Sequence, residues 1–307
     1  MHTFGGGCGI GGSLGADASS HSILDKIGQV EDNLDRLSDK GNTYTFTVDV
    51  GGSGGDGGGG GDVNLTYGGQ IATAGDLADA IVLQSISGGG GQGGSSSASG
   101  SQVQANIAVG VGGKGGTSDN AGTITTYFND SNLNSVNTNG YGSVGVLMQS
   151  IGGGGGQGGD GSDQAEGDIT VGGSAGGTGG TGGGGGLIQS TPGNDSGWVN
   201  LTTQGDEAHG LVAQSIGGGG GIASTGTVDG VRSATVGGTG GAAGDGAFQT
   251  FTHAGFAAGS GAGGGFVIVR DRVGRSDGSV PHVVANRVAD RGVLSGGSAV
   301  PVVQVVS

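Results

Sequence analysis

The chain has 307 residues, of which 85 are glycine, 25 acidic and 10 basic, giving a formal net charge of −15. With three prolines and no glycine at every third position, it is not a collagen triple helix. Residues 1–249 hold 22 acids and 5 bases, a net of −17, which repels phosphate backbones, so we expect no nucleic-acid binding. Aromatic residues at 4% and charged residues at 11% are also typical of a disordered low-complexity chain.

Residues 1–20 form a partial glycine-rich repeat. His2-Thr3-Phe4 before Gly5 aligns with Gln214-Ser215-Ile216 before Gly217, so the sequence begins in mid-repeat. The first residues have neither the basic nor the apolar region of a signal peptide. The sequence has no run of 18 apolar residues, so we expect no membrane insertion by this segment. A single cysteine, Cys8, excludes an internal disulfide.

Residues 21–41 are predicted to form a short amphipathic helix. Apolar side chains recur there at steps of three and four, at Ile23, Ile27, Val30, Leu34 and Leu37. Either Ser20 or Ser22 caps the start of the helix, and Gly41 ends it. We favour a helix that packs its apolar stripe over the first coil of the domain that follows. A coiled-coil or partner-docking helix is the alternative.

Residues 42–249 contain three repeats of about 65 residues. Each repeat ends in Gln-Ser-Ile and a glycine run, and the glutamines Gln84, Gln149 and Gln214 are each 65 residues apart. The same register holds upstream, at Ile71-x-Thr73, Val136-x-Thr138 and Leu201-x-Thr203. Further upstream, an apolar pair leads into glycines at Val48-Asp49-Val50, Val109-Gly110-Val111, Ile169-Thr170-Val171 and Ala234-Thr235-Val236.

This pattern predicts an all-β fold, a parallel β-helix (solenoid) with long glycine-rich loops. The strand candidates are short, alternating and rich in Val, Ile and Thr, and glycine bounds them on both sides. No repeat has enough apolar surface to fold alone, whereas stacked repeats bury a thin continuous core. Coils of roughly 20 to 30 residues predict two or three coils per repeat. The pattern leaves the inward face of the Gln-Ser strand open, and we favour Leu83, Met148 and Ala213 inward.

Residues 250–307 form an irregular tail. The next Gln-Ser is due at Ser279 and is missing, and the tail carries half of all basic residues. A frameshifted end and a capping segment both explain this change.

The sequence predicts no catalytic, cofactor-binding or metal-binding residue, and therefore no cofactor. One stretch, Gly158 to Ala165, partly fits the calcium nonapeptide of β-rolls, but those sites need tandem copies, and Asp56 stands in an isolated setting of the same kind. Nothing resembles a nucleophile elbow or a Gly-Lys-Ser/Thr phosphate loop. The histidines are scattered without ligand spacing; they are His2, His21, His209, His253 and His282.

Gln-Ser-Ile followed by five glycines, as at Gln149 to Gly156 and Gln214 to Gly221, closely resembles the glycine-rich repeats of bacterial autotransporter passengers (type V secretion). The resemblance implies a right-handed parallel β-helix, and display on the outer membrane of a Gram-negative bacterium, or secretion. It implies a non-enzymatic adhesin or structural stalk with host-cell, matrix or bacterial-surface ligands.

The chain lacks the signal peptide and the C-terminal membrane barrel of such proteins, so we expect a passenger fragment. The alternatives are a glycine-rich wall or fibre protein, or a fragment without independent function. Fibre proteins repeat on a few residues and not on 65, which favours the passenger. An enzyme on a β-helix needs an inserted catalytic domain, and no insertion here is long enough for one.

Overall fold

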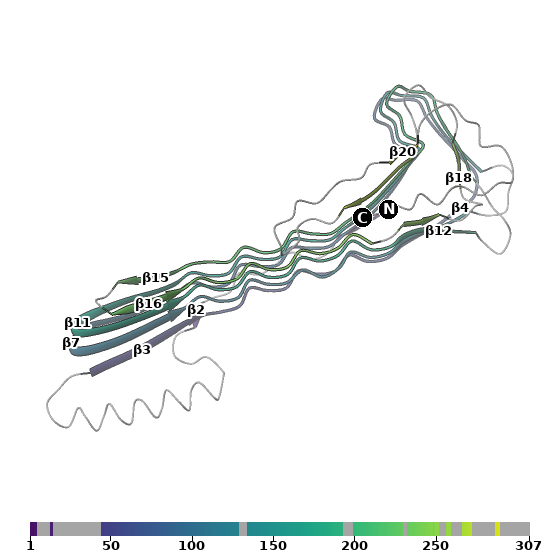
Figure 1. Cartoon of the computed structure of the whole chain (residues 1–307). Helices are drawn as coiled ribbons and strands as arrows, with labels where there is room; N and C mark the ends of the chain where they lie inside the picture. The colour runs from purple at the N-terminus through teal and green to yellow at the C-terminus, as the bar shows by residue number, and fades with distance from the viewer. Residues whose placement is uncertain are drawn as a thin grey trace.

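The computed structural model describes residues 1–4, 13–14, 44–128, 134–192, 199–229, 232–247, 249–251, 256–258, 266–271 and 286–288. These ranges are all-β and contain no helix, and strands from successive repeats stack in parallel sheets, the arrangement of a β-solenoid (Figure 1). The helix predicted over residues 21–41 lies outside the described residues.

Four sheets build the molecule. The glutamine sheet holds β1 (His2–Phe4), β6 (Ile81–Ile86), β10 (Val146–Ile151), β14 (Leu211–Ile216) and β19 (Phe266–Asp271), with β20 (Asn286–Val288) antiparallel on β19. The middle sheet holds β4 (Val63–Tyr67), β8 (Ile124–Phe128), β12 (Ile188–Pro192) and β17 (Gln249–Phe251). The threonine sheet holds β5 (Gln70–Thr73), β9 (Ser135–Thr138), β13 (Val199–Thr203) and β18 (Phe256–Ala258). The tip sheet holds β2 (Ser13–Leu14), β3 (Tyr44–Gly51), β7 (Ser96–Val111), β11 (Gly161–Ala175), β15 (Gly226–Asp229) and β16 (Ser233–Val236).

Each 65-residue repeat makes one coil. Gln149 pairs with Gln84 on one side and with Gln214 on the other, so the predicted single file of glutamines is confirmed. The threonine register is confirmed in the same way, with Thr138 between Thr73 and Thr203. The expectation of two or three coils per repeat was wrong, because the glycine runs do not close compact coils but stretch a single one.

The start of the chain continues the glutamine sheet. Strand β1 pairs in parallel with β6, and His2 lies beside Gln84 and Thr3 beside Ser85. This confirms the alignment of His2-Thr3-Phe4 with the Gln-Ser-Ile motif. After residue 249, three further strands, β17, β18 and β19, extend the middle, threonine and glutamine sheets, and Val269 takes the place in the file that follows Gln214.

The glycine runs form straight arms and not the loops expected from the sequence (Figure 1). Outgoing arms (residues 87–95, 152–160 and 217–225) lead from the glutamine sheet to the tip sheet, and returning arms (52–62, 112–123, 176–187 and 237–247) lead to the middle sheet. The arms are joined by backbone hydrogen bonds at every third residue. The amides of Gly152, Gly155 and Gly158 donate at 2.8–2.9 Å to the next outgoing arm. Those of Gly156 and Gly159 donate at 2.8–2.9 Å to a returning arm.

A three-residue period with no hydrogen bond inside the strand is that of a polyproline II helix. It explains the glycine content of the chain. A Cβ on Gly155 would lie 2.6 Å from the carbonyl carbon of Gly180, whereas the nearest atom to a Cβ on Gly154 is 3.8 Å away. Side chains therefore occur at the outward third position, for example at Gln92 and Gln157, which are one repeat apart.

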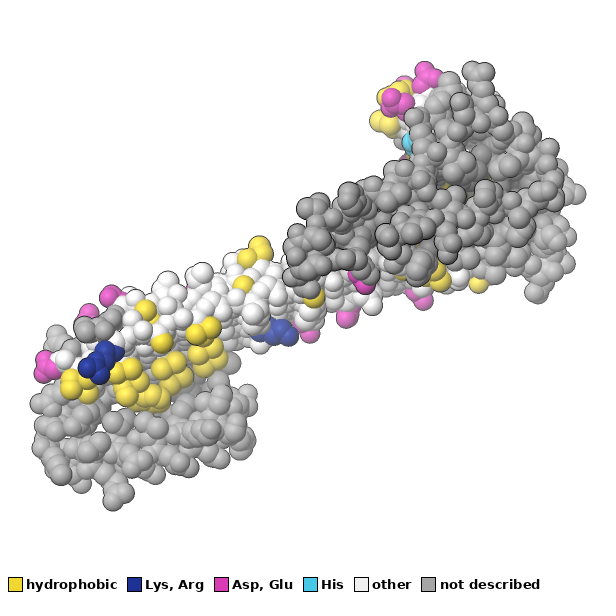
Figure 2. All heavy atoms as spheres, viewed as in Figure 1, with side chains coloured by type: hydrophobic (Ala, Val, Ile, Leu, Met, Phe, Trp, Pro, Cys, Tyr) yellow, Lys and Arg dark blue, Asp and Glu magenta, His cyan; other side chains and the backbone are white. Residues whose placement is uncertain are grey.

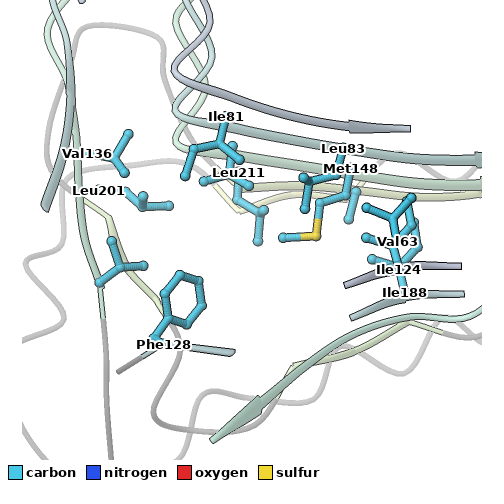
Figure 3. Packing of buried hydrophobic residues seen from close by; sticks show 13 residues of the cluster. Val63, Ile81, Leu83, Ile124, Phe128, Val136, Met148, Ile188, Leu201 and Leu211 are labelled. Atoms are coloured by element: carbon cyan, nitrogen blue, oxygen red, sulfur yellow. The ribbon is translucent and has the colours of Figure 1, made fainter. Parts of the chain in front are cut away.

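The hydrophobic core lies between the glutamine, middle and threonine sheets, at the end of the molecule opposite the tip sheet (Figure 3). Leu83 and Met148 point toward Ile124 and Ile188 across a thin layer, and all four are at most 2% exposed. With Ala213 also buried, the favoured inward face of the Gln-Ser strand is confirmed. One layer of side chains suffices for a core of this width, which accounts for the small number of large residues.

The register of the tip sheet differs from the sequence alignment in the third repeat. Val50, Val111 and Val236 follow one file, as predicted, but Ala175 stands between them and not Val171. Val171 lies beside Ile107, four residues earlier in the strand. The alignment was wrong there because β11 pairs with β7 through a register shift between Ala165 and Gly167, which moves the insertion into the strand.

Candidate functional site

The Gln-Ser motif joins the coils through two separate ladders. The glutamine side chains form a partly exposed ladder, in which Gln84 donates to Gln149 at 2.5 Å and Gln149 to Gln214 at 2.6 Å. The serines point inward and are fully buried. The Ser150 hydroxyl donates to the carbonyl of Gly122 and accepts from the amide of Gly186, at 2.9 and 2.8 Å. Both ladders have a structural role.

Three stacked turns form the candidate contact site, which we call the corner turns: residues 74–80, 139–145 and 204–210. They connect the threonine sheet to the glutamine sheet, at the end of the molecule opposite the tip sheet (Figure 1). In each turn the last threonine of the preceding strand donates to a carbonyl five residues on, from Thr73 to Ala78, Thr138 to Ser143 and Thr203 to Ala208, at 2.7–3.1 Å. The Ile-x-Thr pattern of the sequence therefore sets the shape of each turn.

One position of each corner turn has a left-handed backbone. Leu77, Gly142 and Glu207 stand 65 residues apart with φ of 54°, 63° and 56°. L side chains avoid this region, so leucine and glutamate there are unfavourable compared with glycine. Leu77 is nevertheless 74% exposed and supports no core contact that would require it. Strain at an exposed apolar residue is a feature of contact surfaces.

The exposed side chains of the corner turns mix apolar, aromatic and acidic groups. Tyr141 is 49% exposed, and its hydroxyl donates to the Glu207 carboxylate at 2.5 Å. This hydrogen bond, followed by the charge of Glu207, raises the pKa of Tyr141. The Asp76 carboxylate accepts from the Tyr141 amide at 2.9 Å, which fixes the turns to one another. A rigid aromatic ring beside carboxylates suits contact with a protein or carbohydrate surface.

The interior of the tip sheet holds buried polar atoms that have no hydrogen-bond partner among the described residues. They are Ser96 Oγ, Asn106 Oδ1, both carboxylate oxygens of Asp163, and Ser174 Oγ. Asp163 is 2% exposed, and burial, followed by the charge of Asp229, raises its pKa. A single carboxylate is too little for a metal site.

The acidic residues considered for calcium bind neighbouring arms in the structure. Asp56 accepts from the amide and the hydroxyl of Thr117 at 2.7 and 2.8 Å, and the amide hydrogen bond is the main cause of its lowered pKa. Asp160 accepts from the Ser224 hydroxyl. Over the described part of the chain, no group of three or more His, Cys, Asp or Glu side chains is placed to hold a metal ion. Of the five histidines, only His209 has a described side chain.

Sequence reasoning did not single out the corner turns, although the repeats through them were aligned. No sequence signal marks Leu77 as left-handed, and only Gly142, at the equivalent position, points to it. The described ranges also contain no helix long and apolar enough to cross a membrane.

Comparison with known proteins gives no match: no family model, no curated protein and no solved structure matches this chain.

Proposed function

We propose that this chain is a non-enzymatic, surface-exposed passenger segment of a bacterial autotransporter, a right-handed solenoid that acts as an adhesin or stalk. The carrying observation is the 65-residue coil, in which the Gln-Ser-Ile motif, the five-glycine run and the corner turn each recur in one file. Such a coil uses most of its residues to connect sheets by backbone hydrogen bonds. It therefore serves extension and display better than it serves catalysis.

The corner turns are the part of this surface that fits a ligand. Leu77 and Tyr141 offer exposed apolar area, and the acidic groups beside them give the area a negative charge. The partner proposed is a host-cell, matrix or bacterial-surface ligand, and the place of action is the outer membrane of a Gram-negative cell or the medium around it. A glycine-rich wall or fibre protein is the second candidate, and the hydrogen-bonded glycine arms are the observation that favours it.

The test displays residues 1–307 on a Gram-negative cell between a secretion signal and an autotransporter barrel. We expect the chain to reach the surface, where added protease removes it, and the displayed cells to bind immobilised matrix or each other. The double variant Leu77→Ser with Tyr141→Ser should then lose adhesion. The matched control, Gln92→Ser with Gln157→Ser on the outgoing arms, should keep it.

Surface display without adhesion in any variant would leave the stalk and remove the adhesin. A chain that stays inside the cell, while a known passenger on the same barrel is displayed, would contradict the autotransporter proposal.

A further inference from the structure

The outer side of the tip sheet is apolar (Figure 2). Along β7, Asn106 and Ala108 are fully buried, so the alternate residues Ile107, Val109 and Val111 point outward. The pairing places matching apolar residues beside them on the neighbouring strands. We call this surface the apolar face, and it consists of Phe46, Val48, Val50, Ile107, Val109, Val111, Ile169, Val171, Ala175, Ala234 and Val236.

Exposure across the apolar face is uneven. Ile169 and Val171 on β11 are 63% and 41% exposed, and Val236 on β16 is 63% exposed. The outward residues of β3 and β7 are only partly exposed. Strand β3 is bordered on its outer edge only by the two residues of β2, so it should be more open than β11, which has strands on both sides. The apolar face is therefore covered on its β3 and β7 side.

The chain itself supplies a segment at that place. Strand β2 ends at Leu14, which pairs with Val50 near the end of β3, and the chain resumes at Tyr44, where β3 begins. Residues 15–43 therefore start and finish at opposite ends of one strand. Eight strand residues span about 23 Å. A helix of 20 residues is about 30 Å long, so residues 21–40, with short connections, match the return path along β3.

We propose that residues 21–41 form a helix that lies antiparallel to β3 and docks its apolar stripe on the apolar face over β3 and β7. The stripe, Ile23, Ile27, Val30, Leu34 and Leu37, provides one apolar residue per turn. A helix about 10 Å wide covers two strands that are about 4.8 Å apart. It leaves β11 and β16 uncovered, in agreement with the high exposure of Ile169, Val171 and Val236. The helix covers a face of the sheet and does not cap the open end of the first coil.

Thiol labelling of the full chain tests this placement. In a Cys8→Ser background, Leu34→Cys puts a thiol in the stripe, and Asp32→Cys puts one on the opposite side of the helix. We expect a bulky maleimide to react with Leu34→Cys about tenfold more slowly or less, because docking buries this position and labelling requires the helix to open.

Two further variants show where the helix lies. Val109→Asp puts a charge under the proposed helix and should raise the labelling rate of Leu34→Cys to that of Asp32→Cys. Val236→Asp makes the same change on the uncovered side of the apolar face and should leave the rate low. Ile107→Ser is a milder variant of the first, and hydrogen exchange of the β7 amides checks that the sheet stays folded in each.

Equal labelling of Leu34→Cys and Asp32→Cys would overturn the proposal. Protection that is indifferent to both Val109→Asp and Ile107→Ser would place the helix elsewhere and overturn it as well. Protection that rises with protein concentration would mean that a second copy occupies the face, which also contradicts an internal helix.

Discussion

Two neighbouring glycines of the middle outgoing arm give a matched pair of substitutions. A Cβ on Gly155 would collide with the backbone of Gly180 and lie 2.7 Å from the amide nitrogen of Gly221. A Cβ on Gly154 meets nothing closer than the carbonyl oxygen of Gly219 at 3.8 Å. Gly155→Ala and Gly154→Ala therefore add the same methyl group to the same arm, once between arms and once toward solvent.

The two substitutions should differ by several kcal/mol. The methyl group of Gly155→Ala has no rotamer to escape into, and overpacking of this kind costs about 1 to 3 kcal/mol. Moving the arms apart also weakens the bonds from the Gly221 amide to Gly180 and from the Gly180 amide to Gly156, at 2.8 and 2.9 Å, which contribute about 1 kcal/mol each. We expect a loss of about 3 to 5 kcal/mol. Gly154→Ala restricts the unfolded chain and should be neutral or stabilising by up to about 1 kcal/mol.

Urea unfolding followed by circular dichroism measures both variants against the parent, and hydrogen exchange shows whether the loss centres on the middle coil. Equal free energies of unfolding for Gly154→Ala and Gly155→Ala would refute the close packing of the arms.

Three further substitutions follow from the same geometry. Ser150→Ala leaves the buried amide and carbonyl that its hydroxyl joins without partners, so it should cost about 2 to 4 kcal/mol in thermal unfolding, while Gln149→Ala on the exposed ladder should cost about 1. Asp163 has a raised pKa, so its contribution to stability is fully present below the ordinary value of 3.8 and is lost as pH rises through the raised value. Asp163→Ala should therefore stabilise the chain by about 1 to 3 kcal/mol at pH 7 and by less at pH 4, and an equal gain at both would contradict a buried charge. Glu207→Gly should stabilise by about 0.5 to 1 kcal/mol in a melting experiment, because glycine adopts its φ of 56° without strain.

The repeat register was predictable because it is a property of spacing alone. Gln84, Gln149 and Gln214 occupy equivalent positions in any stack of these units, and their pairing follows from the 65-residue interval. The inward face was a choice between two alternating sets. Ser85 and Ser150 are buried on the chosen side, where the arms supply the partners that a serine needs. Nothing in one repeat reveals those partners.

The arms were missed although the sequence carries their signal. In the returning arms, larger residues recur at every third position, as at Lys114, Thr117, Asn120 and Thr123. That period is hidden in an almost continuous glycine background and reads as a flexible loop unless three-residue spacing is sought. The shift within β11 could not be predicted, because an added residue in a strand changes pairing without changing the alternating pattern.

Residue-resolved hydrogen exchange across residues 152–160 tests the central claim most directly, because the arms are either hydrogen-bonded strands or loops. The amides of Gly152, Gly155, Gly156, Gly158 and Gly159 donate to neighbouring arms or strands, whereas those of Gly154 and Gln157 have no acceptor among the described residues. We predict slow exchange at the first five positions and fast exchange at Gly154 and Gln157, a pattern with a three-residue period. Uniformly fast exchange along this run would contradict the hydrogen-bonded arms and the single 65-residue coil built on them.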